Sequence, residues 1–229
     1  MDKPILLFDL DNTILDFDKD EEVALCKAFR DFGLEPTETI LRRYNQINKW
    51  HWERLEEGRL TRAQVLVGRY VELFKEFGME LEGEPVAKCY EMHLCEGHHF
   101  VEGAEKLLDT LYGQYDMYIV SNGSACVQEG RLKSSGIGKY FKGIFISELM
   151  GHDKPSREFF DLCFSGIKDF SRERAIIIGD SLTSDIRGGR NAGIKTCWFN
   201  PRGEKGREDI APDYIVTSLE DLPALFAAL

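Results

Sequence analysis

Four apolar blocks along the chain have the form of buried strands, because each is an uninterrupted apolar run that ends in a polar turn. They are PILLFDLD (4–11), MYIVSN (117–122), GIFISE (143–148) and AIIIGD (175–180), with KTCWFN (195–200) as a fifth candidate. Such runs are typical of strands buried on both faces of a parallel sheet. Apolar residues at helical spacing lie between the strands, as in residues 104–111. This alternation predicts a doubly wound α/β domain, in which ligands bind beyond the carboxyl ends of the strands.

Residues 16–85 interrupt the alternation, since they contain three amphipathic helical patterns and no strand pattern. The first two patterns each end at a glycine, and the third begins with Thr61 and Gln64 at the spacing of a capping box. We therefore expect two folded units. One is a core made of residues 1–15 and 86–229, and the other is a helical insertion over residues 16–85.

Carboxylates collect where two of the predicted strands end. Asp9 and Asp11 lie one residue apart on an extended segment and so point to the same side. Asp180 ends a later strand and Asp185 follows at an expected helix start; taken singly, these acids are also common in turns and at helix starts. Two such charges about 4 Å apart repel by roughly 4 kcal/mol at an effective dielectric of about 20. A cation would relieve this repulsion, and because the candidate ligands are all oxygens the pattern predicts Mg²⁺ rather than zinc.

Two further positions have the chemistry to hold an anion. Ser121 ends the second predicted strand, and the backbone amides of Asn122 and Gly123 follow it. Lys154 lies in the loop after the third strand and offers a positive charge. Each has a simpler explanation, a turn cap for Ser121 and a surface lysine for Lys154. Their common position at strand ends favours a phosphate-binding role for Ser121, Asn122 and Lys154.

The composition limits the classes of partner. The chain has 43% apolar and 30% charged residues, as in an ordinary globular protein, and a formal net charge of −11. This charge disfavours a nucleic-acid polymer or an anionic membrane as a partner. No apolar run approaches the roughly 20 residues of a membrane span, and the first strand begins too early for a signal peptide. We expect a cytoplasmic protein, a monomer or a homodimer, that acts on a small phosphorylated metabolite.

The six cysteines lack the close pairs of a disulfide framework or a zinc ribbon, so we expect reduced thiols. One local group combines cysteine and histidine: Cys89, His93, Cys95, His98 and His99. The first two could share a helix face, but the spacing matches no common zinc pattern. We interpret this group as a helix end followed by a loop.

The chemical motifs resemble, as a set, those of the haloacid dehalogenase (HAD) superfamily. The motifs are Asp9-x-Asp11-x-Thr13, Ser121, Lys154 and Gly179-Asp180-x4-Asp185, in this order. The resemblance implies a Rossmann-like core with a mobile helical cap inserted after the first motif. Within the superfamily, GDSLTSDIRGGRNAGIKTCWFNP (179–201) and YNQINKWHWERLEEGRLTR in the insertion resemble the bacterial noncanonical pyrimidine 5′-nucleotidases.

The resemblance also implies a role for each residue. Asp9 corresponds to the nucleophile that forms an aspartyl-phosphate, and Asp11 to the general acid and base. Ser121 and Lys154 correspond to the groups that hold the phosphoryl oxygens. The implied Mg²⁺ ligands are the Asp9 carboxylate, the Asp11 backbone carbonyl and Asp180, with Asp185 close by or acting through water. Dehalogenation fits less well, because a second acid at Asp11 serves the protonation of a leaving alkoxide.

The substrate is less defined than the chemistry. Nucleoside 5′-monophosphates are the expected substrates, with sugar phosphates or other small metabolites, and a phosphomutase reaction, as alternatives. A phosphoacceptor signalling receiver is a remote alternative, because it also combines acids, a hydroxyl and a lysine on a doubly wound sheet. Four residues of the insertion could contact a base or a sugar, or could instead fill the core of the insertion: Tyr44, Trp50, Trp52 and Arg69.

Overall fold

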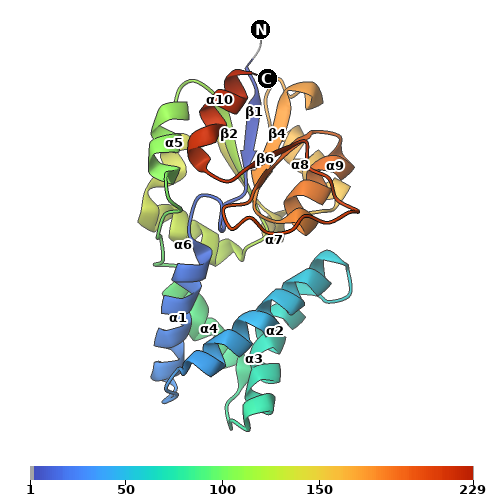
Figure 1. The fold of residues 1–229 in the computed structure, drawn as a ribbon. Helices are drawn as coiled ribbons and strands as arrows, with labels where there is room; N and C mark the ends of the chain where they lie inside the picture. Colours follow the sequence, from blue (N-terminus) through green and yellow to red (C-terminus); the bar gives the residue numbers. More distant parts are fainter. Residues whose placement is uncertain (1–2, 229) are drawn as a thin grey trace. The chain divides into compact units, whose positions relative to one another are not determined.

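The computed structural model describes residues 3–228, and these form two compact units (Figure 1). The first comprises the chain up to Phe17 and from His98 onward, and the second comprises the residues between them. The helical unit thus extends beyond residue 85, where the sequence analysis expected it to end. The reason is the helix α4 (Gly83–Leu94), which packs within this unit and ends where the sequence analysis expected a helix end, near Cys89 and His93.

The core unit contains a parallel sheet with the strand order β3-β2-β1-β4-β5-β6 among the described residues. The strands are β1 (Ile5–Phe8), β2 (Asp116–Ser121), β3 (Gly143–Ile146), β4 (Ala175–Gly179), β5 (Lys195–Phe199) and β6 (Tyr214–Val216). The helices of this unit are α5 (Ala104–Leu111), α6 (Ala125–Ser135), α7 (Ser147–Met150), α8 (Arg157–Ser165), α9 (Arg187–Ala192) and α10 (Leu222–Ala227), with the short turns η1 (Ile137–Tyr140), η2 (Arg172–Arg174), η3 (Leu182–Ile186) and η4 (Leu219–Asp221). The predicted Rossmann-like α/β fold is confirmed, and β6 is an edge strand that the sequence analysis did not predict.

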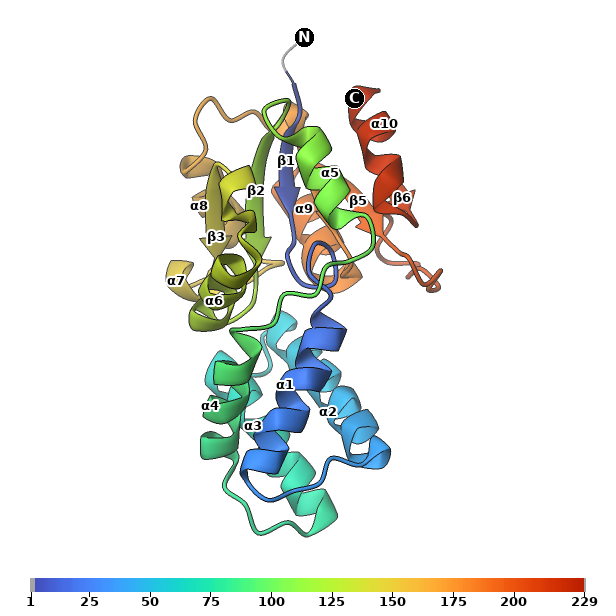
Figure 2. The ribbon, with the colours of Figure 1, turned by 90° about the vertical axis from the view of Figure 1, so that its left-hand side faces the viewer.

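The central strands β1 and β4 are apolar throughout because helices cover both faces of the sheet. Leu6 and Phe8 of β1 pack with α5 and α10 on one face, whereas Ile5 and Leu7 pack with α8 on the other. Figures 1 and 2 show these two layers of helices on either side of the sheet. Each fully buried side chain of this size contributes about 1.5–3 kcal/mol. Burial on both faces therefore fixes the strands and the loops that leave them.

The strand register brings three chain segments to one edge of the sheet. Phe8 pairs with Ile119 of β2 on one side and with Ile178 of β4 on the other. The Asp9 amide extends the pairing with β4, since it donates a hydrogen bond to the Ile178 carbonyl at 2.9 Å. The residues that follow β1, β2 and β4 must therefore lie next to one another at the carboxyl edge of the sheet.

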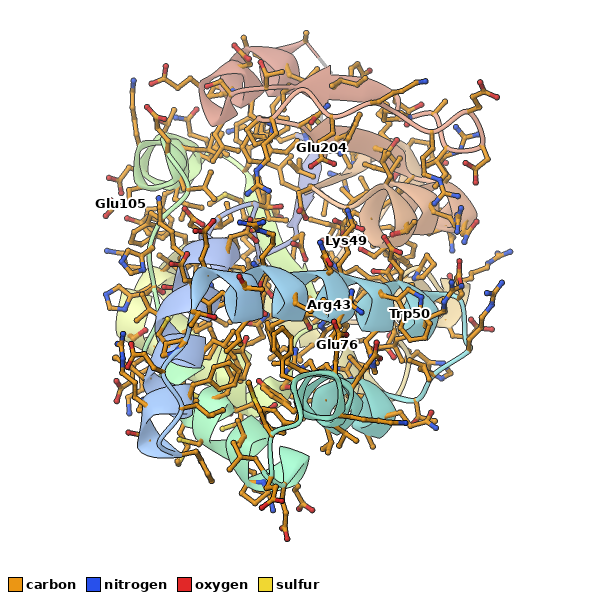
Figure 3. The ribbon with its side chains drawn as sticks, turned by 60° about the horizontal axis from the view of Figure 1, so that its bottom comes forward. Arg43, Lys49, Trp50, Glu76, Glu105 and Glu204 are labelled. Carbon is orange, nitrogen blue, oxygen red and sulfur yellow. The ribbon has the colours of Figure 1, made fainter. Side chains whose placement is uncertain are left out.

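The helical unit contains four helices. They are α1 (Phe17–Asp31), α2 (Glu38–Glu56), α3 (Arg62–Phe77) and α4. The expected capping box begins α3: the Gln64 amide donates to Thr61 Oγ1 at 3.3 Å, and the Thr61 amide donates to Gln64 Oε1 at 2.8 Å. On the surface, Arg43 of α2 and Glu76 of α3 form an ion pair, with Nε and Oε2 2.8 Å apart (Figure 3). None of the helices in the described part of the chain is both long and apolar enough to cross a membrane.

A buried arginine occupies the core of the helical unit. Arg69 is 2% exposed, and its Nη1 donates to Asn48 Oδ1 at 2.6 Å. Asn48 in turn donates through Nδ2 to Glu21 Oε1 at 2.7 Å, so the amide joins a buried cation to a buried anion. The guanidinium carbon lies 5.2 to 5.7 Å from the ring centroids of three tyrosines, Tyr44, Tyr70 and Tyr90.

Two of the four residues considered for base contacts therefore belong to this core. Tyr44 is fully buried, and the Arg69 side chain is enclosed by aromatic rings as well as bonded to Asn48. Trp50 differs, since it is 46% exposed and its ring stacks under Arg54 at 5.1 Å. Trp52 is half-buried. Packing explains Tyr44 and Arg69, as the alternative interpretation of these residues expected.

Candidate active site

Three carboxylates converge at the carboxyl edge of the sheet. Asp9 follows β1, Asp180 follows β4, and Asp185 lies on the π-helical turn η3. Each offers one oxygen, and these oxygens lie within 4.8 Å of one another. Asp9 and Asp185 are buried, and Asp180 is half-buried. The structure thus brings together the three acids that the sequence analysis expected to share a cation.

Lys154 lies between two of these acids. Its Nζ donates to Asp9 Oδ1 at 2.5 Å, to Asp185 Oδ1 at 2.7 Å and to the Val120 carbonyl at 2.8 Å. The side chain is 1% exposed, and the three acceptors match the three protons of an ammonium group. Lys154 is therefore a fully bonded buried cation rather than a surface lysine.

The charges at this edge do not balance. Burial raises the pKa of Asp9 to about 8, against the opposing effect of Lys154 and with the help of Asp185 and Asp11. Burial, followed by the charges of Asp9 and Asp185, raises the pKa of Asp180 well above its usual range. Burial alone would lower the pKa of Lys154, but Asp185 and Asp9 outweigh it and raise the pKa. The single positive charge of Lys154 thus offsets the three crowded carboxylates only in part. Carboxylate oxygens are ligands that suit a hard dication such as Mg²⁺.

The Asp11 carboxylate is held by helix α6. Arg131 Nη1 forms an ion pair with Asp11 Oδ1, and Gln128 Nε2 donates to Asp11 Oδ2 at 2.6 Å. The same Gln128 nitrogen reaches Ser121 Oγ at 2.8 Å. Arg131 is fully buried, with its guanidinium 5.6 Å from the Phe17 ring centroid. Asp11 and Ser121, which are far apart in sequence, therefore share one partner.

The sequence analysis missed both Gln128 and Arg131. Their only signal was position: Arg131 lies four residues after Val127 and next to Leu132, on the buried side of α6. A charged residue on such a face needs a buried partner. That argument marks Arg131 as unusual, but it does not identify Asp11 as the partner.

The loop after β2 is bonded to the lysine loop. Asn122 Oδ1 accepts from the Lys154 amide and Asn122 Nδ2 donates to the Lys154 carbonyl, both at 2.9 Å. Ser121 Oγ accepts from the Gly123 amide at 3.1 Å. The Asn122 side chain therefore positions the Lys154 backbone. Any anion-binding role of Asn122 falls to its backbone amide.

Two glycines leave space for functional side chains. A Cβ at Gly179 would lie 2.2 Å from Asp185 Oδ2, and one at Gly123 would lie 2.1 Å from Gln128 Nε2. The Asp185 carboxylate is also fixed by the Ser181 amide, which donates to Oδ2 at 3.1 Å. Glycine at position 179 is thus required for the buried position of Asp185.

Comparison with known proteins identifies the class. The chain matches the model of the haloacid dehalogenase-like hydrolases over residues 6–199. It is 43% identical to HAD-hydrolase YfnB of Bacillus subtilis over 217 residues, which cover 95% of this chain and 92% of that protein. The chain therefore belongs to the haloacid dehalogenase-like hydrolase family. This membership favours a hydrolase over the signalling receiver.

Two further relatives carry names that describe an activity. Pyrimidine 5′-nucleotidase PynA of Streptococcus pneumoniae is 39% identical over 95% of this chain and 92% of its own length. Pyrimidine 5′-nucleotidase YjjG of Escherichia coli is 32% identical over 96% of each. Among solved structures, YfnB of Bacillus subtilis bound to magnesium matches with a TM-score of 0.95 and 42% identity, covering 99% of both chains.

Proposed function

We propose that this protein is a Mg²⁺-dependent phosphatase that hydrolyses nucleoside 5′-monophosphates through an aspartyl-phosphate on Asp9. The observation that carries the proposal is the grouping of Asp9, Asp180, Asp185 and Lys154 at one edge of the sheet. Perturbed acids with a specific charge partner are typical of catalytic sites. Membership of a hydrolase family supports the same conclusion.

In the proposed first step, a carboxylate oxygen of Asp9 attacks phosphorus and the ester P–O bond breaks. Lys154 holds the other oxygen, Oδ1, and so orients the nucleophile. Asp11 gives its proton to the leaving alkoxide, which departs as the alcohol. The backbone amides after Ser121, together with the positive charge of Lys154, stabilise the phosphoryl oxygens.

In the second step, water attacks the phosphorus of the aspartyl-phosphate. Asp11, now a carboxylate, takes a proton from that water, and the Asp9 carboxylate is regenerated as phosphate leaves. Arg131 and Gln128 hold the Asp11 carboxylate on α6, an orientation that suits its role as a base. The proton donated in the first step is thereby recovered, so the cycle balances.

The candidate ligands for Mg²⁺ are the carboxylates of Asp9 and Asp180 and the backbone carbonyl of Asp11, with Asp185 close by. A bound Mg²⁺ supplies positive charge that neutralises the crowded carboxylates and the phosphoryl group. Asp185 already binds Lys154 and the Ser181 amide, which favours a supporting role for it. The magnesium-bound structure of YfnB supports the choice of Mg²⁺ as the ion.

The nucleotide substrate is proposed from the names of PynA and YjjG, since the described core residues recognise a phosphoryl group rather than a base. We also propose that the helical unit acts as a cap that selects the substrate. Its insertion directly after the Asp9 motif supports this, as does the interdomain movement reported for YfnB.

Phosphate release from a panel of pyrimidine and purine nucleoside monophosphates and sugar phosphates tests the proposal. We expect release from a pyrimidine nucleotide that requires Mg²⁺, stops with a chelator and is lost in Asp9→Asn. The surface variant Asp161→Asn is the matched control and should keep full activity. Full activity of Asp9→Asn would contradict the mechanism, and preference for every sugar phosphate over every nucleotide would contradict the substrate. A mutase would instead require a bisphosphate activator.

A further inference from the structure

A second group of metal-binding side chains lies in the helical unit, separate from the acids of the core. Asp31 is the last residue of α1, and Cys89 and His93 lie on α4. One oxygen, Asp31 Oδ2, contacts both His93 Nε2 at 2.7 Å and Cys89 Sγ at 3.4 Å. The three ligand atoms lie within 4.8 Å of one another.

The helical arrangement explains why these atoms meet. Cys89 and His93 are four residues apart, so they project from the same face of α4. Asp31 is 58 residues before Cys89 and approaches that face from the end of α1. Cys89 is 8% exposed, whereas the side chains of His93 and Asp31 are 26% and 54% exposed. The sulfur is thus sheltered while the opposite side of the group is open to solvent.

The distances suit a tetrahedral ion. With Zn–S near 2.3 Å and Zn–N or Zn–O near 2.0 Å, neighbouring ligand atoms in a zinc site lie about 3.3–3.6 Å apart. The present Sγ–Oδ2 separation of 3.4 Å fits that range. The Nε2–Oδ2 separation of 2.7 Å needs to widen by only about 0.6 Å to reach it. Small side-chain movements are enough, because two of the three groups are partly exposed.

The ligand types select the ion. A thiolate and an imidazole favour zinc over magnesium, which prefers oxygen, and a carboxylate is an accepted third zinc ligand. In the present structure the Cys89 thiol donates a hydrogen bond to Asp31, so a metal would take the place of the thiol proton, which would be released to solvent. An ordinary Asp–His ion pair would not need a cysteine sulfur in contact with the same carboxylate oxygen, as Cys89 is here.

We propose that Asp31, Cys89 and His93 form a zinc-binding site, with solvent as the fourth ligand. The site joins the end of α1 to α4, the first and last helices of the helical unit, and so closes a long loop of chain. Bound zinc therefore stabilises the helical unit. This inference does not rest on the proposed phosphatase activity, because none of its residues belongs to the Asp9 group.

Cobalt is the probe that tests the site, because thiolate coordination gives Co²⁺ an intense near-ultraviolet charge-transfer band. We expect the metal-free full chain, kept reduced, to develop this band on addition of Co²⁺ and to lose it when Zn²⁺ displaces the cobalt. The band should disappear in Cys89→Ala. It should persist in Cys126→Ser, which removes an exposed cysteine outside the group, and in Asp9→Asn.

Zinc affinity and thermal unfolding provide the second measurement. Removal of a residue that only supports a metal ligand typically weakens metal binding by about 10–100-fold. Loss of a ligand itself, in His93→Ala or Asp31→Asn, should therefore weaken zinc binding by about 100-fold or more. Zinc should raise the melting temperature of the wild type but not of these variants. Asp31→Asn changes a largely exposed residue, so its folding is not in question. Cobalt binding without a thiolate band, or a band that survives in His93→Ala and Asp31→Asn, would overturn the proposal.

Discussion

Replacement of Lys154 by methionine tests the charge balance of the site directly. Methionine has a similar length and volume but no charge, so Lys154→Met removes the cation while keeping the space filled. The change leaves the carboxylates of Asp9 and Asp185 buried without the ammonium group that now bonds to both at 2.5 and 2.7 Å. The expected result is a large loss of stability in the absence of Mg²⁺.

The size of this loss follows from the burial of the pair. Removal of one partner from a buried ion pair costs about 3–5 kcal/mol. For a chain of this size, 1 kcal/mol shifts the melting temperature by about 2–4 °C, so the expected fall is roughly 6–20 °C. The loss is limited because Asp9 can take up a proton. Its pKa is already raised to about 8, and Lys154 lowers it, so removal of Lys154 raises the pKa of Asp9 further. The penalty should therefore be smaller at about pH 6, where Asp9 is protonated in both proteins, than at about pH 9, where Asp9 of the wild type is ionised and bonded to Lys154.

Thermal unfolding followed by far-ultraviolet circular dichroism, with and without Mg²⁺, measures both effects. Mg²⁺ should raise the melting temperature of Lys154→Met more than that of the wild type, because the dication replaces the missing positive charge. Lys168→Met, a surface change on the same unit, is the control. A variant that melts within about 2 °C of the wild type in chelator at about pH 9 would refute the electrostatic argument, because it would lie outside the expected range.

Three further predictions concern the same site. Burial raises the pKa of Asp9 to about 8, and protons compete with a metal for this carboxylate, so Mg²⁺ affinity measured by calorimetry should increase between about pH 6 and about pH 8; a flat profile would contradict this. General acid–base catalysis contributes roughly 10²–10⁴-fold to a rate, and Arg131→Met should lower kcat by part of this factor with little change in KM. Arg131→Lys should recover part of the lost kcat. An unchanged kcat in Arg131→Met would contradict the positioning role of Arg131. Gly179→Ala should cost about 1–3 kcal/mol in thermal unfolding, because its Cβ would lie 2.2 Å from Asp185 Oδ2, whereas Gly138→Ala, which meets open space, should be neutral; equal effects would exclude the steric explanation.

The central strands of the sheet were predictable because they are buried on both faces. An uninterrupted apolar run such as that of β4 has few alternatives, and parallel pairing then brings all the strand ends to one edge. The edge strand β6 gave no such signal. It has only three residues, and Ile215 at its centre is 57% exposed. β3 is also an edge strand, and Ile144 is 40% exposed, but its apolar run was recognised. The length of the uninterrupted apolar run, rather than burial on both faces, therefore decided which strands could be recognised.

The sequence analysis ended the helical unit at residue 85, whereas the structure continues this unit through α4 to Gly97. Pro85 lies at the expected boundary, close to Gly83 and Glu84. In the structure these residues form the first turn of α4. Backbone amides in a first turn have no partner within the helix, so proline is tolerated there. The same residue type can therefore begin a helix or end one, and only the burial of the following turns distinguishes the two cases.

The site residues also divide into those that the sequence revealed and those that only the packed structure revealed. The acids after β1 and β4 were identifiable because strand ends of a parallel sheet must meet, but their partners on helices were not.

Both units use one arrangement, in which an amide side chain joins a buried arginine to a carboxylate. The two sets are Arg131–Gln128–Asp11 and Arg69–Asn48–Glu21.

An amide suits this position because its oxygen accepts from the arginine while its nitrogen donates to the acid, so that each charged group gains a hydrogen bond. Gln128 and Arg131 lie three residues apart on one helix, so their contact follows from helical geometry. Asn48 and Arg69 lie on different helices and meet only after α2 packs on α3. A charged residue at an apolar helix position thus reveals from sequence that a partner must exist, but only the packed structure reveals which residue it is.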